Sequence, residues 1–273
     1  MLSPNSGGTA LSPTRAPRAT EVRILGAMPG PTHSLTVSAW LRWNAVSRWL
    51  PANPATQVLE VGCGVGGLSQ LLAERYRYTA VEMDETAARR ASLRVTPLGG
   101  TVITGSTGAL GDTFRADLVC AFEVLEHIED DRTALEDWAS KLTPGGVLLV
   151  TTPGYPARFG PADARVGHWR RYDPATLRDM LRDVGLAEVE VHHYGGPVSF
   201  ALDAIRQRLA KLDERRAPAD KHTATLKSGQ LLQPRGSRSA RMTQIAAYPA
   251  TLIEHMFPDR GIGLIAVGRR PTG

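Results

Sequence analysis

Apolar and polar positions alternate along most of this chain in a way that predicts short buried strands separated by amphipathic helices. Apolar runs predict strands at 58–61, 78–83, 101–105, 117–122, 147–150, 186–191 and 262–267. Between these runs apolar residues recur at helical spacing, as at Leu177, Leu181 and Val184. Helices that alternate with strands predict an α/β fold around a mostly parallel sheet.

Composition narrows the class of protein. With 273 residues and 42% apolar residues, the chain can build one large domain with additions. Its two cysteines, Cys63 and Cys120, fall in predicted core, which argues against a disulfide framework. No apolar run reaches the roughly 20 residues of a membrane span, and the N-terminus lacks a secretion signal. We therefore expect a cytoplasmic protein.

The first strand leads into a turn rich in glycine, which predicts a cradle for a nucleotide cofactor. Gly62, Gly64 and Gly67 fit the dinucleotide pattern, with Glu82 at the offset of a ribose carboxylate. An acid-x-G-x-G-x-G pattern fits equally well, with Glu60 as the acid and Gly62, Gly64 and Gly66 as the glycines. That second pattern suits a cofactor with an ammonium and a sulfonium group. The turn alone leaves both cofactors open.

Two later segments carry a resemblance to a known family. The strand beginning Asp117-Leu-Val runs into Glu123-Val-Leu-Glu126-His127, and the segment 142–150 reads Leu-Thr-Pro-Gly-Gly-Val-Leu-Leu-Val. In these features the chain resembles class I S-adenosylmethionine-dependent methyltransferases related to the ubiquinone-biosynthesis O-methyltransferases. The resemblance implies a Rossmann-like sheet of seven strands, mostly parallel, with helices on both faces. It also implies an antiparallel last strand and a helical or loop insertion between the last two strands.

The resemblance implies a set of residues that bind S-adenosylmethionine at the carboxyl ends of the strands. Glu82 is expected to accept hydrogen bonds from the ribose hydroxyls. Ser106 stands where the family commonly has an acid that contacts the adenine amino group, so the adenine contact departs from the family pattern. The full expected set is Glu60, Gly62, Cys63, Gly64, Gly66, Glu82, Met83, Ser106 and Glu123.

The motif at the end of the fourth strand predicts the catalytic residues His127 and Glu126. Together with Glu123 and with His168 on a facing loop, they offer N and O ligands suited to Mg²⁺, Mn²⁺ or Zn²⁺. This set resembles the metal site of ubiquinone-type and small-RNA 2′-hydroxyl methyltransferases. In the alternative without a metal, Glu126 caps the next helix and His127 acts as general base.

The substrate residues expected from the resemblance are Trp43, His168, Arg170 and Tyr172. Trp43 lies in a predicted helix over 34–50, and its alternative role is packing against the sheet. The acceptor atom is expected to be an oxygen of a small or lipid-linked, anionic molecule. Quinone precursors, small natural products, glycans and RNA ends all stay open as acceptors.

We expect the chain to divide into a disordered tail at 1–30 and one methyltransferase domain at 31–273. Within the domain we expect a helix at 31–50, a cofactor-binding core at 51–194, a basic insertion at 195–258 and the last strand with its tail at 259–273. The formal net charge is +5, and the stretch 206–241 holds ten Lys or Arg against three Asp or Glu. We interpret the insertion as a cap that supplies cations to the acceptor. The alternatives are a non-catalytic module that binds nucleic acid or membrane, and an NAD(P)-dependent oxidoreductase.

Overall fold

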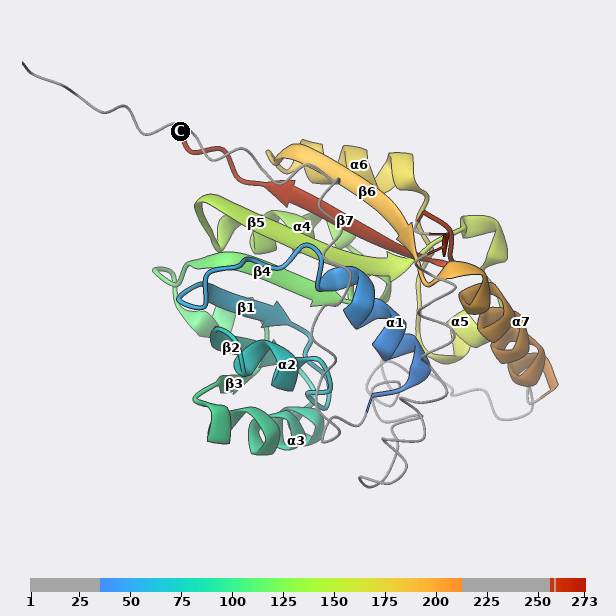
Figure 1. The fold of residues 1–273 in the computed structure, drawn as a ribbon, viewed down its shortest axis with the longest axis horizontal. Helices are drawn as coiled ribbons and strands as arrows, with labels where there is room; N and C mark the ends of the chain where they lie inside the picture. Colours follow the sequence, from blue (N-terminus) through green and yellow to red (C-terminus); the bar gives the residue numbers. More distant parts are fainter. Residues whose placement is uncertain (1–34, 213–255, 258) are drawn as a thin grey trace, which may run out of the picture.

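The computed structural model describes residues 35–212, 256–257 and 259–273. Within these residues seven strands form one sheet in the order β3-β2-β1-β4-β5-β7-β6 (Figure 1). The strands are β1 (Gln57–Val61), β2 (Arg77–Glu82), β3 (Thr101–Thr104), β4 (Ala116–Phe122), β5 (Leu142–Pro153), β6 (Ala187–Tyr194) and β7 (Gly263–Arg269). Only β7 runs antiparallel to its neighbours, between β5 and β6. This arrangement confirms the predicted fold class.

Helices cover both faces of the sheet. The α-helices are α1 (Val37–Val46), α2 (Ser69–Ala73), α3 (Glu85–Val95), α4 (Asp131–Ser140), α5 (Pro161–Arg165), α6 (Pro174–Asp183) and α7 (Gly196–Leu212). Short 3₁₀ helices are η1 (Thr96–Leu98), η2 (Thr107–Leu110), η3 (Leu125–His127) and η4 (Pro156–Arg158). Apolar side chains of α1, α2 and α3 pack in one core cluster, and those of α4 and α6 pack in a second. In Figure 1, α5 and α7 lie beyond the carboxyl ends of the parallel strands.

Local capping signals define several helix ends. The Asp130 side chain accepts a hydrogen bond from the Thr133 amide at the start of α4. Asp173 does the same for α6, whose first residue is Pro174, and Leu177 and Leu181 of that helix are fully buried. These ends and this buried stripe agree with the sequence pattern. α1 is shorter than the predicted helix over 34–50, because its last turn closes at Ser47 rather than at Pro51.

The fifth strand is longer than predicted. The pattern places a helix end at Pro144-Gly145-Gly146 and the strand at 147–150, whereas α4 ends at Ser140 and β5 begins at Leu142. The Gly145 amide donates to the Arg270 carbonyl, and the Arg270 amide donates to the Gly146 carbonyl. β5 tolerates a proline there because its register against β4 shifts between Ala116 and Leu118. The prediction of a helix end at Pro144 is therefore wrong.

α7 begins the predicted insertion and confirms that this segment contains a helix. The predicted tail at 1–30 and most of the basic stretch lie outside the described residues. Among the described residues, no helix combines the length and the apolar character that a membrane crossing requires.

Candidate functional site

The glycine turn joins β1 to α2 in a left-handed backbone. Gly62, Gly64 and Gly66 have φ angles of 70°, 55° and 80°, which residues with a Cβ rarely adopt. A Cβ at Gly62 would come within 2.6 Å of a Val124 methyl carbon, and one at Gly66 within 2.8 Å of the Ala91 Cα. At Gly64 no atom of the described part of the chain lies within 4 Å of that position. Two of the glycines thus allow close packing, and Gly64 faces open space.

Glu82 holds this turn in place from the end of β2. Its carboxylate accepts a hydrogen bond from the Gly64 amide at 2.7 Å and another from the Asp84 amide at 2.9 Å. Because each carboxylate oxygen can accept two hydrogen bonds, both oxygens keep capacity for a ligand. Met83, the next residue, is 68% exposed. The predicted ribose carboxylate therefore lies directly against the open glycine.

Glu60 lies beneath the turn. It is buried, and its carboxylate accepts hydrogen bonds from the Ser69 hydroxyl at 2.7 Å and from the Tyr78 hydroxyl. Burial raises the pKa of Glu60 to about 7, against the opposite effect of these two hydrogen bonds. Cys63 is also buried, which raises the pKa of its thiol. In this position Glu60 supports the turn from below.

Ser106 follows β3 and caps η2, where its hydroxyl oxygen accepts a hydrogen bond from the Gly108 amide at 3.3 Å. The neighbouring Gly105 amide donates to the Glu82 carbonyl. Ser106 is therefore placed beside the end of β2, as an adenine contact requires, although part of its acceptor capacity serves the cap.

Glu123 follows β4 with a left-handed φ of 57°. Its carboxylate lies 3.3 Å from the Arg42 guanidinium of α1 and accepts a hydrogen bond from the Tyr194 hydroxyl at 3.1 Å. Arg42 also donates to that hydroxyl. Burial is the largest single effect and would raise the pKa of Glu123, but the charges of Arg42 and His168 together with the Tyr194 hydrogen bond outweigh it, and the pKa is lowered. The sequence analysis missed Arg42 and Tyr194.

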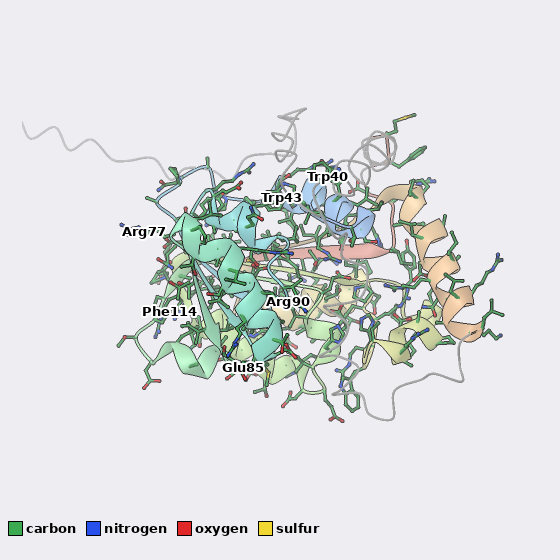
Figure 2. All side chains as sticks on the ribbon, turned by 90° about the horizontal axis from the view of Figure 1, so that it is seen from below. Trp40, Trp43, Arg77, Glu85, Arg90 and Phe114 are labelled. Atoms are coloured by element: carbon green, nitrogen blue, oxygen red, sulfur yellow. The ribbon has the colours of Figure 1, made fainter. Side chains whose placement is uncertain are left out.

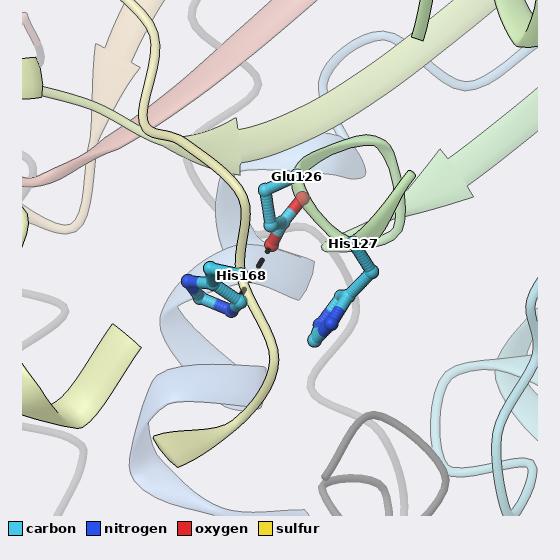
Figure 3. A group of neighbouring side chains, drawn as sticks. All are labelled: Glu126, His127 and His168. Carbon is cyan, nitrogen blue, oxygen red and sulfur yellow. Dashed lines mark ion pairs between the residues drawn. The ribbon is translucent and has the colours of Figure 1, made fainter. Parts of the chain in front are cut away.

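Three of the four predicted metal ligands come together at the end of β4 (Figure 3). Glu126, His127 and His168 each offer a ligand atom, and these atoms all lie within 4.8 Å of one another. His168 Nε2 lies 3.8 Å from Glu126 Oε1, and the two imidazole rings meet edge to face with centroids 4.6 Å apart. Glu123 is not part of this group, because its carboxylate turns to Arg42.

The Glu126 carboxyl group is unusual for a buried side chain. It is fully buried, and among the residues that the structure describes neither of its oxygens has a hydrogen-bond partner. Burial and then the charge of Glu123 raise its pKa well above the usual value. The pKa of His127 is lowered to about 3, chiefly by burial and then by His168. His127 is therefore neutral near pH 7, and Glu126 is a buried carboxyl group whose hydrogen-bonding capacity is not used by the described residues.

The other residues predicted to contact the substrate are bound to, or packed against, neighbouring parts of the protein. Arg170 donates to the Asp131 carboxylate at 2.7 Å and to the Glu129 carbonyl at 2.6 Å. Tyr172 is buried, and its hydroxyl donates to the same Asp131 carboxylate. Trp43 is buried in the core, with the Arg75 guanidinium 5.3 Å from its ring centroid. Figure 2 shows it beside Trp40. The position of Trp43 corresponds to the packing alternative.

An open cleft with an empty volume of about 610 Å³ lies between α1, α7 and the ends of β4 to β7. Glu123 and Tyr194 line it, and its charged lining also includes Arg42, Asp203 and Arg206. Glu123 also acts electrostatically on Glu126 and His127, so the cleft adjoins the Glu126, His127 and His168 group through Glu123.

Comparison with known proteins places the chain in a family. Residues 41–191 match the model of a methyltransferase domain. The chain is 31% identical over 173 residues to a protein of Mycobacterium tuberculosis named a probable S-adenosylmethionine-dependent methyltransferase, covering 60% of this chain and 62% of that one. It is 34% identical over 101 residues to a ubiquinone biosynthesis O-methyltransferase of Idiomarina loihiensis, covering 35% and 42%.

The solved structure of an S-adenosylmethionine-dependent methyltransferase from Mesorhizobium loti has the same fold, with a TM-score of 0.55 and 17% identity. The match covers 86% of this chain and 100% of that one. The chain spans less than two thirds of the length of the two curated relatives named above. The domain match covers more than half of the chain, from α1 through β6, and includes the glycine turn and the whole Glu126 group. The chain therefore belongs to the family of proteins that share this methyltransferase domain.

Proposed function

We propose that the protein transfers a methyl group from S-adenosylmethionine to an acceptor. The observation that carries this proposal is the placement of the glycine turn and the Glu123-to-His127 segment at the same edge of the sheet. β1 and β4 are paired neighbours, with Val61 opposite Ala121, so the two segments follow adjacent strand ends. A cofactor on the glycine turn can therefore reach groups that follow β4.

The residues present fit S-adenosylmethionine. Gly64 leaves open space where a Cβ would stand, and the Glu82 carboxylate beside it keeps acceptor capacity for ribose hydroxyls. Exposed Met83 and Ser106 flank the position of the adenine. Glu60 supports the turn from below, and Glu123 lies toward the acceptor. When bound, the cofactor supplies an electrophilic methyl group, and the protein aligns it with the nucleophile and excludes water.

We propose the cleft between α1 and α7 as the acceptor site. Arg206 is about half exposed in its lining and can pair with an anionic group on the acceptor. Arg171 cannot take this role, because it is buried and bound to Asp163 and Asp203. An oxygen nucleophile is favoured by the resemblance to a protein whose name specifies O-methylation. The acceptor is then a small or lipid-linked molecule with an anionic group.

The Glu126, His127 and His168 group is proposed to activate the acceptor oxygen. The group fits a divalent cation, because it offers a carboxylate without a partner and an imidazole that stays neutral. Such an ion would act as a Lewis acid that lowers the pKa of the acceptor hydroxyl. In the alternative without an ion, His127 accepts the proton itself. Burial lowers the pKa of His127, which makes it a weak base in the protein as it stands.

Calorimetry tests the cofactor. We expect S-adenosylhomocysteine to bind, NAD to give no heat, and Glu82→Ala to weaken the binding of S-adenosylhomocysteine. Tight NAD binding without a response to S-adenosylhomocysteine would contradict the proposal.

Transfer of label from S-adenosylmethionine to extract metabolites then identifies the acceptor. Turnover in excess EDTA, compared with turnover after addition of Mg²⁺, Mn²⁺ or Zn²⁺, decides between the metal and the base.

A further inference from the structure

His168 is held from behind by a buried carboxylate. Its Nδ1 lies 3.0 Å from Asp163 Oδ1, and both side chains are buried. On the other side of the ring, Nε2 faces Glu126 Oε1 at 3.8 Å. Trp169 fixes the loop itself, because its amide donates to the Glu126 carbonyl at 2.7 Å. The imidazole therefore stands between two carboxyl groups with different surroundings.

Donors from four residues surround the Asp163 carboxylate. Arg171 donates through Nε to Oδ1 at 3.0 Å and through Nη2 to Oδ2 at 2.8 Å. Gln207 Nε2 donates to Oδ2 at 2.7 Å, and the Gly160 amide donates to the same oxygen at 2.9 Å. An ionised carboxylate can only accept hydrogen bonds. Its contact with His168 therefore requires the proton to be on Nδ1 of the ring.

We propose that Asp163 is a positioning residue, which fixes His168 in the Nδ1-protonated form and directs the Nε2 lone pair at Glu126 and His127. An Nε2 lone pair is what a metal ligand or proton acceptor needs. This inference deepens the proposed function and rests on it for the catalytic role of His168. The orientation of the ring does not depend on that role.

α7 is part of the same support. Gln207 accepts a hydrogen bond from the Ala162 amide at 2.9 Å while it donates to Asp163, so it joins α7 to α5. Asp203 of α7 accepts from Arg171 at 2.8 Å. The helix that lines the acceptor cleft therefore also holds the carboxylate that orients His168. A shift of α7 on acceptor binding would reach the ring through these two contacts.

NMR of ¹⁵N-histidine-labelled protein measures the tautomer directly. The spectrum is recorded in EDTA at about pH 8. The His168 signals are assigned by their loss in His168→Gln. We expect the proton on Nδ1. A wild-type spectrum in which Nε2 carries a proton, whether or not Nδ1 does as well, overturns the proposal. This measurement needs neither cofactor nor acceptor, so its failure is separate from failure of the proposed function.

Asp163→Asn tests the role of the carboxylate. We expect His168 to lose the uniform Nδ1–H form and kcat to fall by about 10- to 100-fold, as for other partners of this kind. The Kd of S-adenosylhomocysteine should not change. A folded variant in which His168 keeps the Nδ1–H form overturns the proposal. Asp173→Asn is the matched control, because Asp173 also caps a helix but accepts from Ala175 and Thr176.

Gln207→Leu tests whether α7 helps to orient His168. It also provides a second test of the proposal if Asp163→Asn does not fold. The variant removes one donor from Asp163 and leaves Arg171 in place. We expect mixed tautomers at His168 and a smaller decrease of kcat. An unchanged spectrum with unchanged kcat would exclude Gln207 from the support of His168.

Discussion

The two parts of the candidate site hold their charged side chains in different ways. Around the glycine turn, Glu82 binds amides of Gly64 and Asp84, and Glu60 binds hydroxyls of Ser69 and Tyr78, all within eighteen residues. Around the acceptor cleft, the partners come from distant parts of the chain. The first arrangement depends on local backbone geometry, and the second depends on the docking of whole helices.

Of the residues that line the cleft, Asp203 binds the buried Arg171 across 32 residues, and Tyr194 binds Glu123 across 71. Buried ion pairs of this kind stabilise little overall, but the loss of one partner leaves a buried charge unpaired. The acceptor side should therefore be sensitive to single charge removals. The cofactor side should respond mainly in ligand affinity.

Glu126→Gln should have the largest effect, and it should act on activity alone. We expect the rate of methyl transfer to fall by about 10²- to 10⁴-fold, because the group would lose its carboxylate ligand or proton acceptor. The free energy of unfolding should not fall, because Glu126 has no hydrogen bond to a described residue to lose and Gln mimics the protonated form that burial favours. Rate assays and urea unfolding measure the two effects. Glu129→Gln, at an exposed position nearby, is the control. A variant with full activity would remove Glu126 from the mechanism.

Arg171→Met should have the next largest effect, and it should act on stability. Its removal leaves the buried Asp163 and Asp203 without their shared cation, which costs about 3–5 kcal/mol of unfolding free energy. Arg132→Met removes an ion pair of similar length to Asp183, but both of its side chains are more than half exposed. That control should lose at most about 1 kcal/mol. Equal losses in the two variants would show that burial is not what distinguishes the acceptor side.

Glu82→Gln should lower the affinity for S-adenosylhomocysteine by about 10- to 100-fold, because hydrogen bonds to a charged acceptor contribute about 1.5–3 kcal/mol. Stability should change less than in Arg171→Met, since the amide oxygen still accepts from the glycine turn. Calorimetry gives the affinity. Glu85→Gln on the exposed face of α3 is the control. An unchanged Kd would mean that Glu82 serves the turn alone.

The smallest effect is a pH dependence carried by Glu60. Its pKa is about 7 in the folded protein and about 4.5 in the unfolded chain, so the folded state binds the proton more tightly. The unfolding free energy should therefore fall as the pH rises from about 5 to 8. Glu60→Gln has no such proton, so its stability relative to the wild type should rise over this range by about 1–3 kcal/mol. Parallel pH profiles for the two proteins would contradict the pKa.

The features that depend on neighbouring residues could be predicted from the sequence. The apolar runs gave the strands, Asp173 and Pro174 gave the start of α6, and the glycines gave the turn. The family resemblance gave the position of β7, which no local pattern specifies. Pro144 misled the prediction, because a pairing with Arg270 far along the chain keeps that segment extended.

In the candidate site too, residues of one local motif could be predicted, whereas residues with distant partners could not. Glu126 and His127 stand in one motif, and the resemblance suggested His168 as their partner. Asp163 was missed, because its partners Arg171 and Gln207 follow by spacings that no motif records. Its one local signal is the acid at the third position of α5 after Gly160 and Pro161, which is also an ordinary capping pattern.

The pairing of Tyr194 with Gly263 has a consequence for how this protein can be altered. The chain leaves β6 at Tyr194 and enters β7 at Gly263, and these two residues lie opposite each other in the sheet. The pairing of β6 with β7 therefore holds the two ends of the intervening segment close together. Closing a longer loop between fixed ends adds only about 0.6 kcal/mol for each doubling of its length. Segments of very different length can therefore replace the chain after α7 while β6 and β7 stay paired. The sheet can accept a new acceptor-binding segment at this point without being redesigned.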